Sequence, residues 1–445
     1  MLLASCAPAG EGSHSAGNSA EQDEGGGPYG EFIPDAPGRL PNGGRPVHKV
    51  PFPEISDWGS LKINLKRSGC FGTCPAYTVT ITGDGSVEYV GAYYVAISGT
   101  HRSRVTPAET RALYDTFRTA DFFNTFDTYR AGVTDNPAYA VRIAYDGKEK
   151  SVIDYVGPMI GMPKEITEIE KEIDRVAKTK KWITGDESTV ASLQAEGWDF
   201  KAKDEEHLSL IAAAGRSHNP DLVRGLLAAG LTADTVWGCN AVGSAARAGD
   251  ASTVQMLIAA GAPVHWDVPE GTAETCDALH SASLGGSPQI VRTILTRNPD
   301  VNWQSRGVGP TALMLAAAGR CAKEATDCNR AKVVELLINA GADVNLRDEN
   351  GDGVIADLSD NAEVARRLIA AGAKDLSRVD RNGKTPLGRS YTAEVTKVLL
   401  DAGADPWVLD RQGKNAWEAV SITFGSQNGA AVVLKQWMDA RPKPQ

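Results

Sequence analysis

Two cysteines lie close together in the stretch SGCFGTCPAY, which covers residues 68–77. Cys70 and Cys74 are separated by three residues, and pairs of this kind serve three chemistries. Paired thiols exchange electrons in redox enzymes, thiolates bind zinc when further ligands lie nearby, and oxidised pairs close a small loop. The pair alone does not decide among them, because the compartment determines whether thiols stay reduced.

The first residues bear on that compartment. Leu3-Ala4-Ser5-Cys6 resembles a bacterial lipobox, in which an apolar and two small residues precede a cysteine that receives lipid. Such signals also carry a basic segment and an apolar stretch of about 7–15 residues upstream, which a start assigned too far downstream would remove. The resemblance implies export and lipidation at Cys6. Ala7 is not the aspartate of an inner-membrane retention signal, so it implies the periplasmic side of the outer membrane, or the periplasm.

Composition narrows the possible partners. Residues 7–57 are rich in Gly, Ser, Pro and acids, and we expect a disordered tether because they bury too little apolar surface. The net charge of −10 argues against nucleic-acid binding, since a phosphate backbone repels an acidic surface. No run of about 18 apolar residues occurs, so we expect membrane contact only through the lipid.

Export favours a structural interpretation of the first cysteine pair. The chain has seven cysteines, and a lipidated Cys6 leaves an even number that fall in neighbouring pairs. A redox motif usually has two intervening residues, and no further zinc ligands are spaced near Cys70 and Cys74. We therefore expect a disulfide-closed turn there.

The C-terminal half of the chain repeats itself. LLINAGADVNLRDENG (336–351) and LLDAGADPWVLDRQG (399–413) are plainly related, and a Gly or Asn is expected to end the second helix of each unit in the left-handed conformation. We call these helix-ending residues the anchors of the repeats. They are Gly197, Gly230, Gly261, Asn298, Gly341, Gly372 and Gly403. The pattern resembles the ankyrin repeat, whose period is about 33 residues. The resemblance covers residues 187–440 and implies an all-α solenoid that binds other proteins.

Two of the repeats are over-length. GRCAKEATDCNRAK (319–332) is inserted between the two helices of one unit, and we expect a disulfide between Cys321 and Cys328 to close it. Cys239 and Cys276 occupy equivalent places in adjacent repeats. Packed helices lie about 8–10 Å apart, whereas a disulfide needs Cα atoms within about 4.4–6.8 Å, so the sequence leaves this pairing open.

Tryptophans follow several of the anchors by a few residues. They are Trp237, Trp266, Trp303 and Trp407. The ankyrin resemblance implies partner binding through hairpin tips and inner helices, and aromatic side chains are enriched at binding hot spots. The four rings form either a partner-binding patch or packing contacts between neighbouring hairpins, and the sequence allows both.

Residues 58–182 show the period-two alternation of half-buried strands. The alternating apolar residues are Leu61, Ile63, Leu65, Tyr77, Val79 and Ile81. GDG (83–85) and Asp146-Gly147 predict hairpins, and Thr106 with Glu109 forms a capping box at the start of a helix. A closing helix is predicted from Ile166, Ile169, Ile173 and Val176. We predict an α+β domain with an antiparallel sheet and helices.

A second resemblance covers this domain. The segment from Gly69 to Tyr77 fits the pattern Gly-Cys-Phe-Gly-x-Cys-Pro-x-Tyr, and AGVTDNPAYAVRI follows later. Both are similar to a bacterial family of uncharacterised domains that often occur on exported proteins. The resemblance implies a module and no known activity.

Common sequence patterns for catalysis, cofactor binding or metal binding do not occur in the chain. There is no G-x-S-x-G, phosphate loop or H-E-x-x-H. Residues 348–359 mimic an EF-hand loop, but Ser359 stands where a bidentate Glu is needed. Asp135, Tyr139, His101 and Asp154 form either a polar site or a structural network. We expect no catalytic residue, cofactor or metal.

The sequence thus favours an exported, lipid-anchored protein whose ankyrin solenoid binds another protein. One alternative is an enzyme or small-ligand receptor in residues 58–182, with the solenoid as a docking arm. The other is a toxin-neutralising protein of the immunity type. A pocket with convergent polar groups would favour the first alternative, and a single stoichiometric partner the second.

Overall fold

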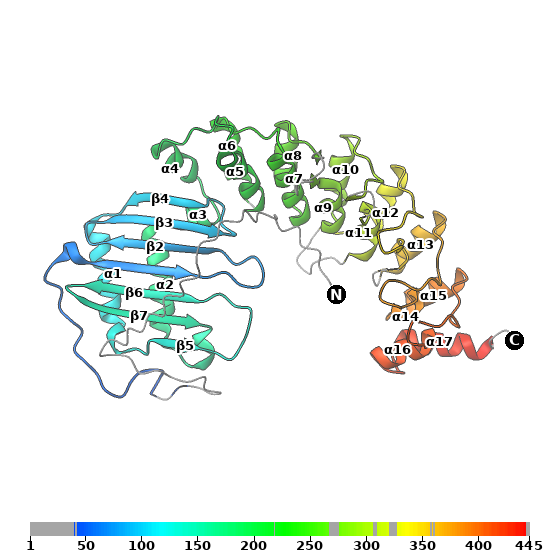
Figure 1. Ribbon diagram of the computed structural model, residues 1–445, viewed down its shortest axis with the longest axis horizontal. Helices are drawn as coiled ribbons and strands as arrows, with labels where there is room; N and C mark the ends of the chain where they lie inside the picture. Colours follow the sequence, from blue (N-terminus) through cyan, green and yellow to red (C-terminus); the bar gives the residue numbers. More distant parts are fainter. Residues whose placement is uncertain are drawn as a thin grey trace, which may run out of the picture. The chain divides into compact units, whose positions relative to one another are not determined.

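The computed structural model describes residues 40, 42–217, 219–266, 276–305, 309–319, 327–356, 358 and 361–441. They divide into two compact units, which meet in the sequence between Leu231 and Thr232. The first unit holds a seven-stranded sheet and the start of the repeats, and the second holds the other repeats (Figure 1). Within the described ranges, no helix is both long and apolar enough to cross a membrane.

The sheet has the strand order β4-β3-β2-β1-β6-β7-β5. The strands are β1 (Lys62–Arg67), β2 (Ala76–Thr82), β3 (Ser86–Tyr93), β4 (Gly99–Arg104), β5 (Thr128–Arg130), β6 (Tyr139–Tyr145) and β7 (Lys148–Tyr155). Neighbours pair antiparallel except β5 and β7, which are parallel. In the central strand β1, Ile63 and Leu65 are buried while Lys62 and Lys66 are exposed, so the alternation gives the sheet a buried face and an open face.

Helices cover the buried face, as Figure 1 shows for α1 (Pro107–Thr119) and α2 (Lys164–Ala177) behind the strands. Short 3-10 turns accompany them at η1 (Trp58–Ser60), η2 (Phe122–Asn124) and η3 (Gly157–Ile160). The predicted capping box opens α1: Thr106 accepts a hydrogen bond from the Glu109 amide, and the Glu109 carboxylate accepts one from the Thr106 amide. The predicted antiparallel sheet with helices is confirmed.

The segment that precedes the sheet differs from the sequence prediction, which assigned residues 7–57 to a disordered tether. Residues 7–39 lie outside the described residues, but 42–57 pack along the domain. The Phe52 ring meets Phe123 edge to face at 5.1 Å, and Tyr145 donates a hydrogen bond to the Pro53 carbonyl at 2.8 Å. One aromatic anchor and satisfied carbonyls order a stretch whose average composition is that of a linker.

The repeat region begins inside the first unit. After the short helix α3 (Lys180–Ile183), its first helices are α4 (Thr189–Ala195), α5 (Glu205–Arg216) and α6 (Pro220–Ala229). His101 of β4 is buried, stacks on Trp182 with ring centroids 4.3 Å apart, and meets Glu196 at the end of α4. Glu196 also accepts a hydrogen bond from the Arg102 amide at 2.9 Å, so one carboxylate joins the sheet edge to the first repeat helix.

The second unit stacks helices in antiparallel pairs (Figure 1). They are α7 (Val236–Ala248), α8 (Ala251–Ala259), α9 (Ala278–Gly285), α10 (Pro288–Leu295), α11 (Ala312–Ala318), α12 (Arg330–Asn339), α13 (Ala362–Ala370), α14 (Pro386–Arg389), α15 (Ala393–Asp401), α16 (Ala416–Phe424) and α17 (Gly429–Ala440). A two-stranded ribbon joins β8 (His265–Trp266) to β9 (Cys276–Asp277). All seven predicted anchors have positive φ, including Asn298 at 50°, as a left-handed helix end requires.

Asparagine side chains fix the register between consecutive hairpins. The Asn302 amide donates to the Gly341 carbonyl and accepts from the Asp343 N–H, at 3.2 and 2.8 Å. Asn345 repeats this one unit later, donating to the Gly372 carbonyl and accepting from the Lys374 N–H. Each asparagine therefore satisfies two backbone groups of the next repeat, and we call this the asparagine ladder.

Replacing Asn345 by Ala should lower the free energy of unfolding by about 1–2 kcal/mol, because two hydrogen bonds between repeats are lost. Asn345→Asp keeps the acceptor and should lose less. Denaturant unfolding of the full chain measures both variants. An alanine variant as stable as the unchanged protein would show that the ladder does not couple the repeats.

Candidate partner-binding surface

A compact polar and aromatic cluster lies where three repeats meet. The buried carboxylate of Asp277 contacts Nδ1 of His280 at 2.7 Å and Nδ1 of His265 at 3.1 Å. The Trp303 ring stands edge-on to both imidazoles, with centroids 5.0 and 5.1 Å away. We call these four residues the His–Trp cluster. It spans β8, α9 and the next hairpin, so it depends on the repeats being stacked.

Charge holds this cluster together. Nε2 of His280 lies 2.8 Å from the Pro310 carbonyl and its Nδ1 lies 2.7 Å from the Asp277 carboxylate, so both ring nitrogens face oxygen atoms. Burial alone would raise the pKa of Asp277, but the hydrogen bonds and charge of His280 outweigh it and lower that pKa. The result is a rigid, half-exposed aromatic surface that rests on the buried carboxylate of Asp277.

The four predicted tryptophans have different surroundings, and all are half-buried. Trp303 belongs to the His–Trp cluster, and Trp266 adjoins it in β8, where it pairs with Cys276. Trp237 lies in the first turn of α7, which packs against β8 and β9. The hairpin residue Trp407 donates its amide to Asp405. The structure therefore gathers three of them around one ribbon and leaves Trp407 apart from it.

A disulfide supports the same ribbon. Cys239 of α7 and Cys276 of β9 are bonded, with Cα atoms 6.1 Å apart, which settles the pairing that the sequence left open. The backbone approaches because Cys276 lies in β9 and not in a packed helix. The His–Trp cluster itself was missed in the sequence analysis. The only sequence signal for it was two histidines near Asp277, and their meeting depends on repeat stacking.

The other predicted cysteine pairs have different outcomes. Cys70 and Cys74 are bonded, with Cα atoms 5.5 Å apart, so the structural interpretation of the first motif is confirmed. Cys328 is also disulfide-bonded. Its expected partner Cys321 lies outside the described residues, as does Cys6, so the Cys321–Cys328 pairing and lipidation at Cys6 stay predictions.

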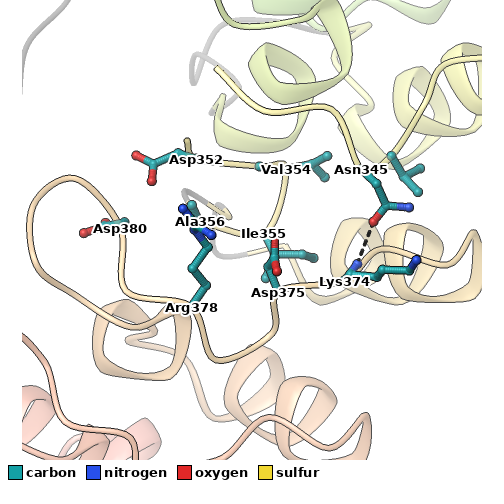
Figure 2. A pocket seen from close by; sticks show the side chains of 11 residues that line it. Asn345, Asp352, Val354, Ile355, Ala356, Lys374, Asp375, Arg378 and Asp380 are labelled. Atoms are coloured by element: carbon teal, nitrogen blue, oxygen red, sulfur yellow. Dashed lines mark hydrogen bonds between the residues drawn. The ribbon is translucent and has the colours of Figure 1, made fainter. Parts of the chain in front are cut away.

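A small pocket lies between two successive hairpins further along the array (Figure 2). Asp352 and Asp380 lie on one side of it, and on the other the Asn345 side chain accepts from the Lys374 amide. Its free volume is about 10 Å³, which holds about one water. Burial raises the pKa of Asp352, and its carboxylate accepts from the Arg381 amide. The pocket holds hairpins together and is too small for a ligand.

The same hairpin contains the EF-hand-like residues. The Asp348 carboxylate accepts from the amides of Asn350 and Asp352 at 2.8 and 3.0 Å, so it closes its own turn. Ser359 lies outside the described residues. Among the residues that are described, no group of three or more His, Cys, Asp or Glu side chains is placed to hold a metal ion.

The first unit contains a buried cluster of acids between β7 and α2. Asp154 and Glu170 are each 5% exposed, and Asp174 accepts hydrogen bonds from Tyr77 and Thr179, both at 2.7 Å. Burial raises the pKa of Glu170 to about 8, and the charges of Asp154 and Asp174 add to the shift. Glu170 therefore carries a proton at neutral pH. Asp154 and Glu170 are enclosed, whereas Asp174 is half-buried and lines an open hollow of about 300 Å³ between the end of α2 and α3.

The polar set suggested by the sequence does not form one site. Tyr139 and Asp154 face each other across β6 and β7. His101 lies in β4, at the other side of the sheet order, where its ring nitrogens contact Glu196 and the Ser98 carbonyl. Asp135 is exposed in the loop before β6. Sequence separation gave no guide here, because strand order decides which residues meet.

Comparison with known proteins agrees with this two-part architecture. Residues 61–177 match the model described as a domain of unknown function, DUF6438. Residues 208–305 and 245–348 match the model of ankyrin repeats. The chain thus carries an N-terminal DUF6438 domain and ankyrin repeats, which are protein–protein interaction modules.

Particular relatives share parts of the chain. The E3 ubiquitin-protein ligase KEG of Arabidopsis thaliana is 34% identical over 207 residues, which are 43% of this chain and 11% of the relative. The Ankyrin repeat and SOCS box protein 6 of Homo sapiens is 25% identical over 166 residues, 34% of this chain and 37% of the relative. The chain therefore spans well under half of the length of these curated relatives.

Two solved structures are similar to parts of this chain. The ankyrin repeat domain of human ASB11 covers 58% of this chain and 95% of its own, with 19% identity and a TM-score of 0.34. A chain from the complex of the predatory endopeptidase Bd0816 of Bdellovibrio bacteriovorus with immunity protein Bd3460 covers 44% of this chain and 96% of its own. That match has 24% identity and a TM-score of 0.35.

Proposed function

We propose that this protein is an exported, lipid-anchored recognition protein whose ankyrin repeats bind another protein around the His–Trp cluster. The observation that carries the proposal is the rigid aromatic surface at β8, where Trp266 and Trp303 stand half-exposed over a disulfide-supported ribbon. Preorganised aromatic side chains bind with little loss of conformational entropy, which is typical of binding hot spots.

The anchor and the compartment belong to the same proposal. The lipobox-like residues support lipidation at Cys6, on the periplasmic side of the outer membrane. Two disulfides support an oxidising compartment, because such bonds persist mainly in exported proteins. The proposal assigns recognition to the chain, and it gives Asp154 and Glu170, whose pKa values burial raises, a place in the enclosed interior of the first unit.

The test compares the full chain with Trp266→Ala/Trp303→Ala in crosslinking and pull-down from envelope fractions. We expect the unchanged protein to capture partner protein that the double variant loses, because removing two hot-spot side chains costs several kcal/mol of binding free energy. Trp437→Ala, in α17, is the matched control and should keep the partner. Retention of the partner by the double variant, with its circular dichroism unchanged, would exclude this surface.

Cys6→Ala tests the anchor separately. The variant should leave the membrane fraction, because a lipid chain supplies the attachment. A variant that stays membrane-bound, or unchanged protein without lipid by mass spectrometry, would contradict the anchor without affecting the proposed binding surface.

A further inference from the structure

The open face of the sheet is a second surface to which the proposed function assigns no role. It is formed by the outward residues of β1 and its neighbours, and the strand register aligns them in transverse rows. One row runs from Val90 through Thr78, Lys66 and Ala140 to Ile153. α1 and α2 lie on the other side of the sheet (Figure 1).

Positive charge is concentrated on this face although the chain is acidic overall. Its cations are Lys62, Lys66, Arg102, Arg104 and Arg142, and the carboxylates beside them are Asp84, Glu88 and Glu149. The three arginines pair with the three carboxylates. Lys62 and Lys66, on the central strand, have no ion-pair partner among the described residues. Two unpaired ammonium groups thus stand in the middle of the face.

Apolar side chains flank the second of these lysines. Val90 is 38% exposed and Ile153 is 39% exposed, one on each side of Lys66 in the same row. Each lies two strands away from it, or about 10 Å. Lys62 and Lys66 are four residues apart on one strand, or about 13 Å. The face therefore offers two cationic points with apolar contacts to either side.

We propose that this face docks an acidic segment of a partner protein. Its carboxylates would lie at Lys62 and Lys66, and its apolar side chains against Val90 and Ile153. Charge complementarity supports an acidic occupant, because opposite charges steer and orient association. A polypeptide fits better than a lipid surface, since the rows through Lys62 and Lys66 carry Thr and Ala and no aromatic side chain, and the exposed rings of Tyr93 and Phe71 lie at the strand ends beyond these rows.

The probe for this proposal is an amphipathic peptide of about 16 residues that carries Glu and Leu on one face. A second peptide has Gln in place of every Glu. Fluorescence anisotropy with the full chain should show that Lys62→Glu/Lys66→Glu weakens binding of the Glu peptide at least about tenfold. Lys164→Glu/Lys171→Glu, on the exposed side of α2, is the matched control and should change it less than about twofold.

Zero-length crosslinking locates the contact. A carbodiimide joins a lysine amine to a Glu carboxyl as an amide, and mass spectrometry should find the bonds at Lys62 or Lys66. Crosslinks spread evenly over surface lysines, equal losses in both double variants, or equal binding of the Gln peptide would overturn the proposal. Binding of phosphatidylglycerol vesicles through Lys62 and Lys66, without binding of the Glu peptide, would overturn it in favour of a membrane.

The proposal for the open face can be refuted without refuting the proposal for the His–Trp cluster, and the reverse also holds. Trp266→Ala/Trp303→Ala should bind the Glu peptide as the unchanged protein does, because those residues belong to the other compact unit. Loss of peptide binding in this variant, with Lys62→Glu/Lys66→Glu unaffected, would place the acidic segment on the repeats and refute the open face.

Discussion

Replacing Glu170 by Gln is expected to stabilise the first unit at pH 8 and to leave it nearly unchanged below pH 4.5. Burial, with Asp154 and Asp174, raises the pKa of Glu170 from 4.5 to about 8 in the folded protein. The folded state then binds this proton more tightly than the unfolded chain does. Stability is therefore fully present below pH 4.5 and is lost as the pH rises towards 8.

The effect is large because the free energy of unfolding falls by about 1.4 kcal/mol for each pH unit between the two pKa values of Glu170. The total loss is therefore on the order of 4–5 kcal/mol. Glutamine stays neutral and avoids the loss. Hydrogen exchange of the α2 amides between pH 5 and 9, corrected for intrinsic rates, reports this unit alone. Glu168→Gln, exposed on the same helix, is the control and should show a flat difference. Parallel curves for Glu170→Gln and the unchanged protein would contradict the raised pKa.

Removing the disulfide between Cys239 and Cys276 should destabilise the second unit by about 4 kcal/mol on the chain-entropy model. The bond joins residues 37 apart, so the unfolded chain gains considerable freedom when it is lost. The bond between Cys70 and Cys74 joins residues only four apart and should contribute about 2 kcal/mol. The ranking follows from loop length alone.

Denaturant unfolding of Cys239→Ser/Cys276→Ser and of Cys70→Ser/Cys74→Ser measures both effects, with hydrogen exchange assigning each loss to its unit. The first variant should also lose the order of β8 and β9, which carry His265 and Asp277 of the His–Trp cluster. A smaller loss for the first variant than for the second would show that native-state strain outweighs the entropy of the unfolded chain.

The sequence predicted those parts of the fold that depend on residues close together in the chain. The left-handed helix ends at the seven anchors, the capping box of α1 and the hairpin at Asp146-Gly147 all follow from backbone sterics and short-range hydrogen bonds. The alternation in β1 and β2 was equally clear, because half-buried strands repeat with period two.

Elements that depend on distant partners were not predictable in this way. β4 reads GTHRSR and has no apolar residue, so its alternation was invisible; His101 is buried only because Trp182 and Glu196 cover it. The same holds for the candidate surface. Trp266 and Trp303 were found from their spacing, whereas His265 and Asp277 meet only after the repeats stack.

The contact between Glu196 and the Arg102 amide has a consequence for solubility. A strand at the edge of a sheet exposes unpaired amides that recruit strands of other chains. In β4 the Arg102 amide is already occupied by the Glu196 carboxylate, and the buried His101 side chain holds that carboxylate in place. The first repeat helix thereby guards the sheet against edge-to-edge aggregation, a task separate from any recognition by the repeats that follow.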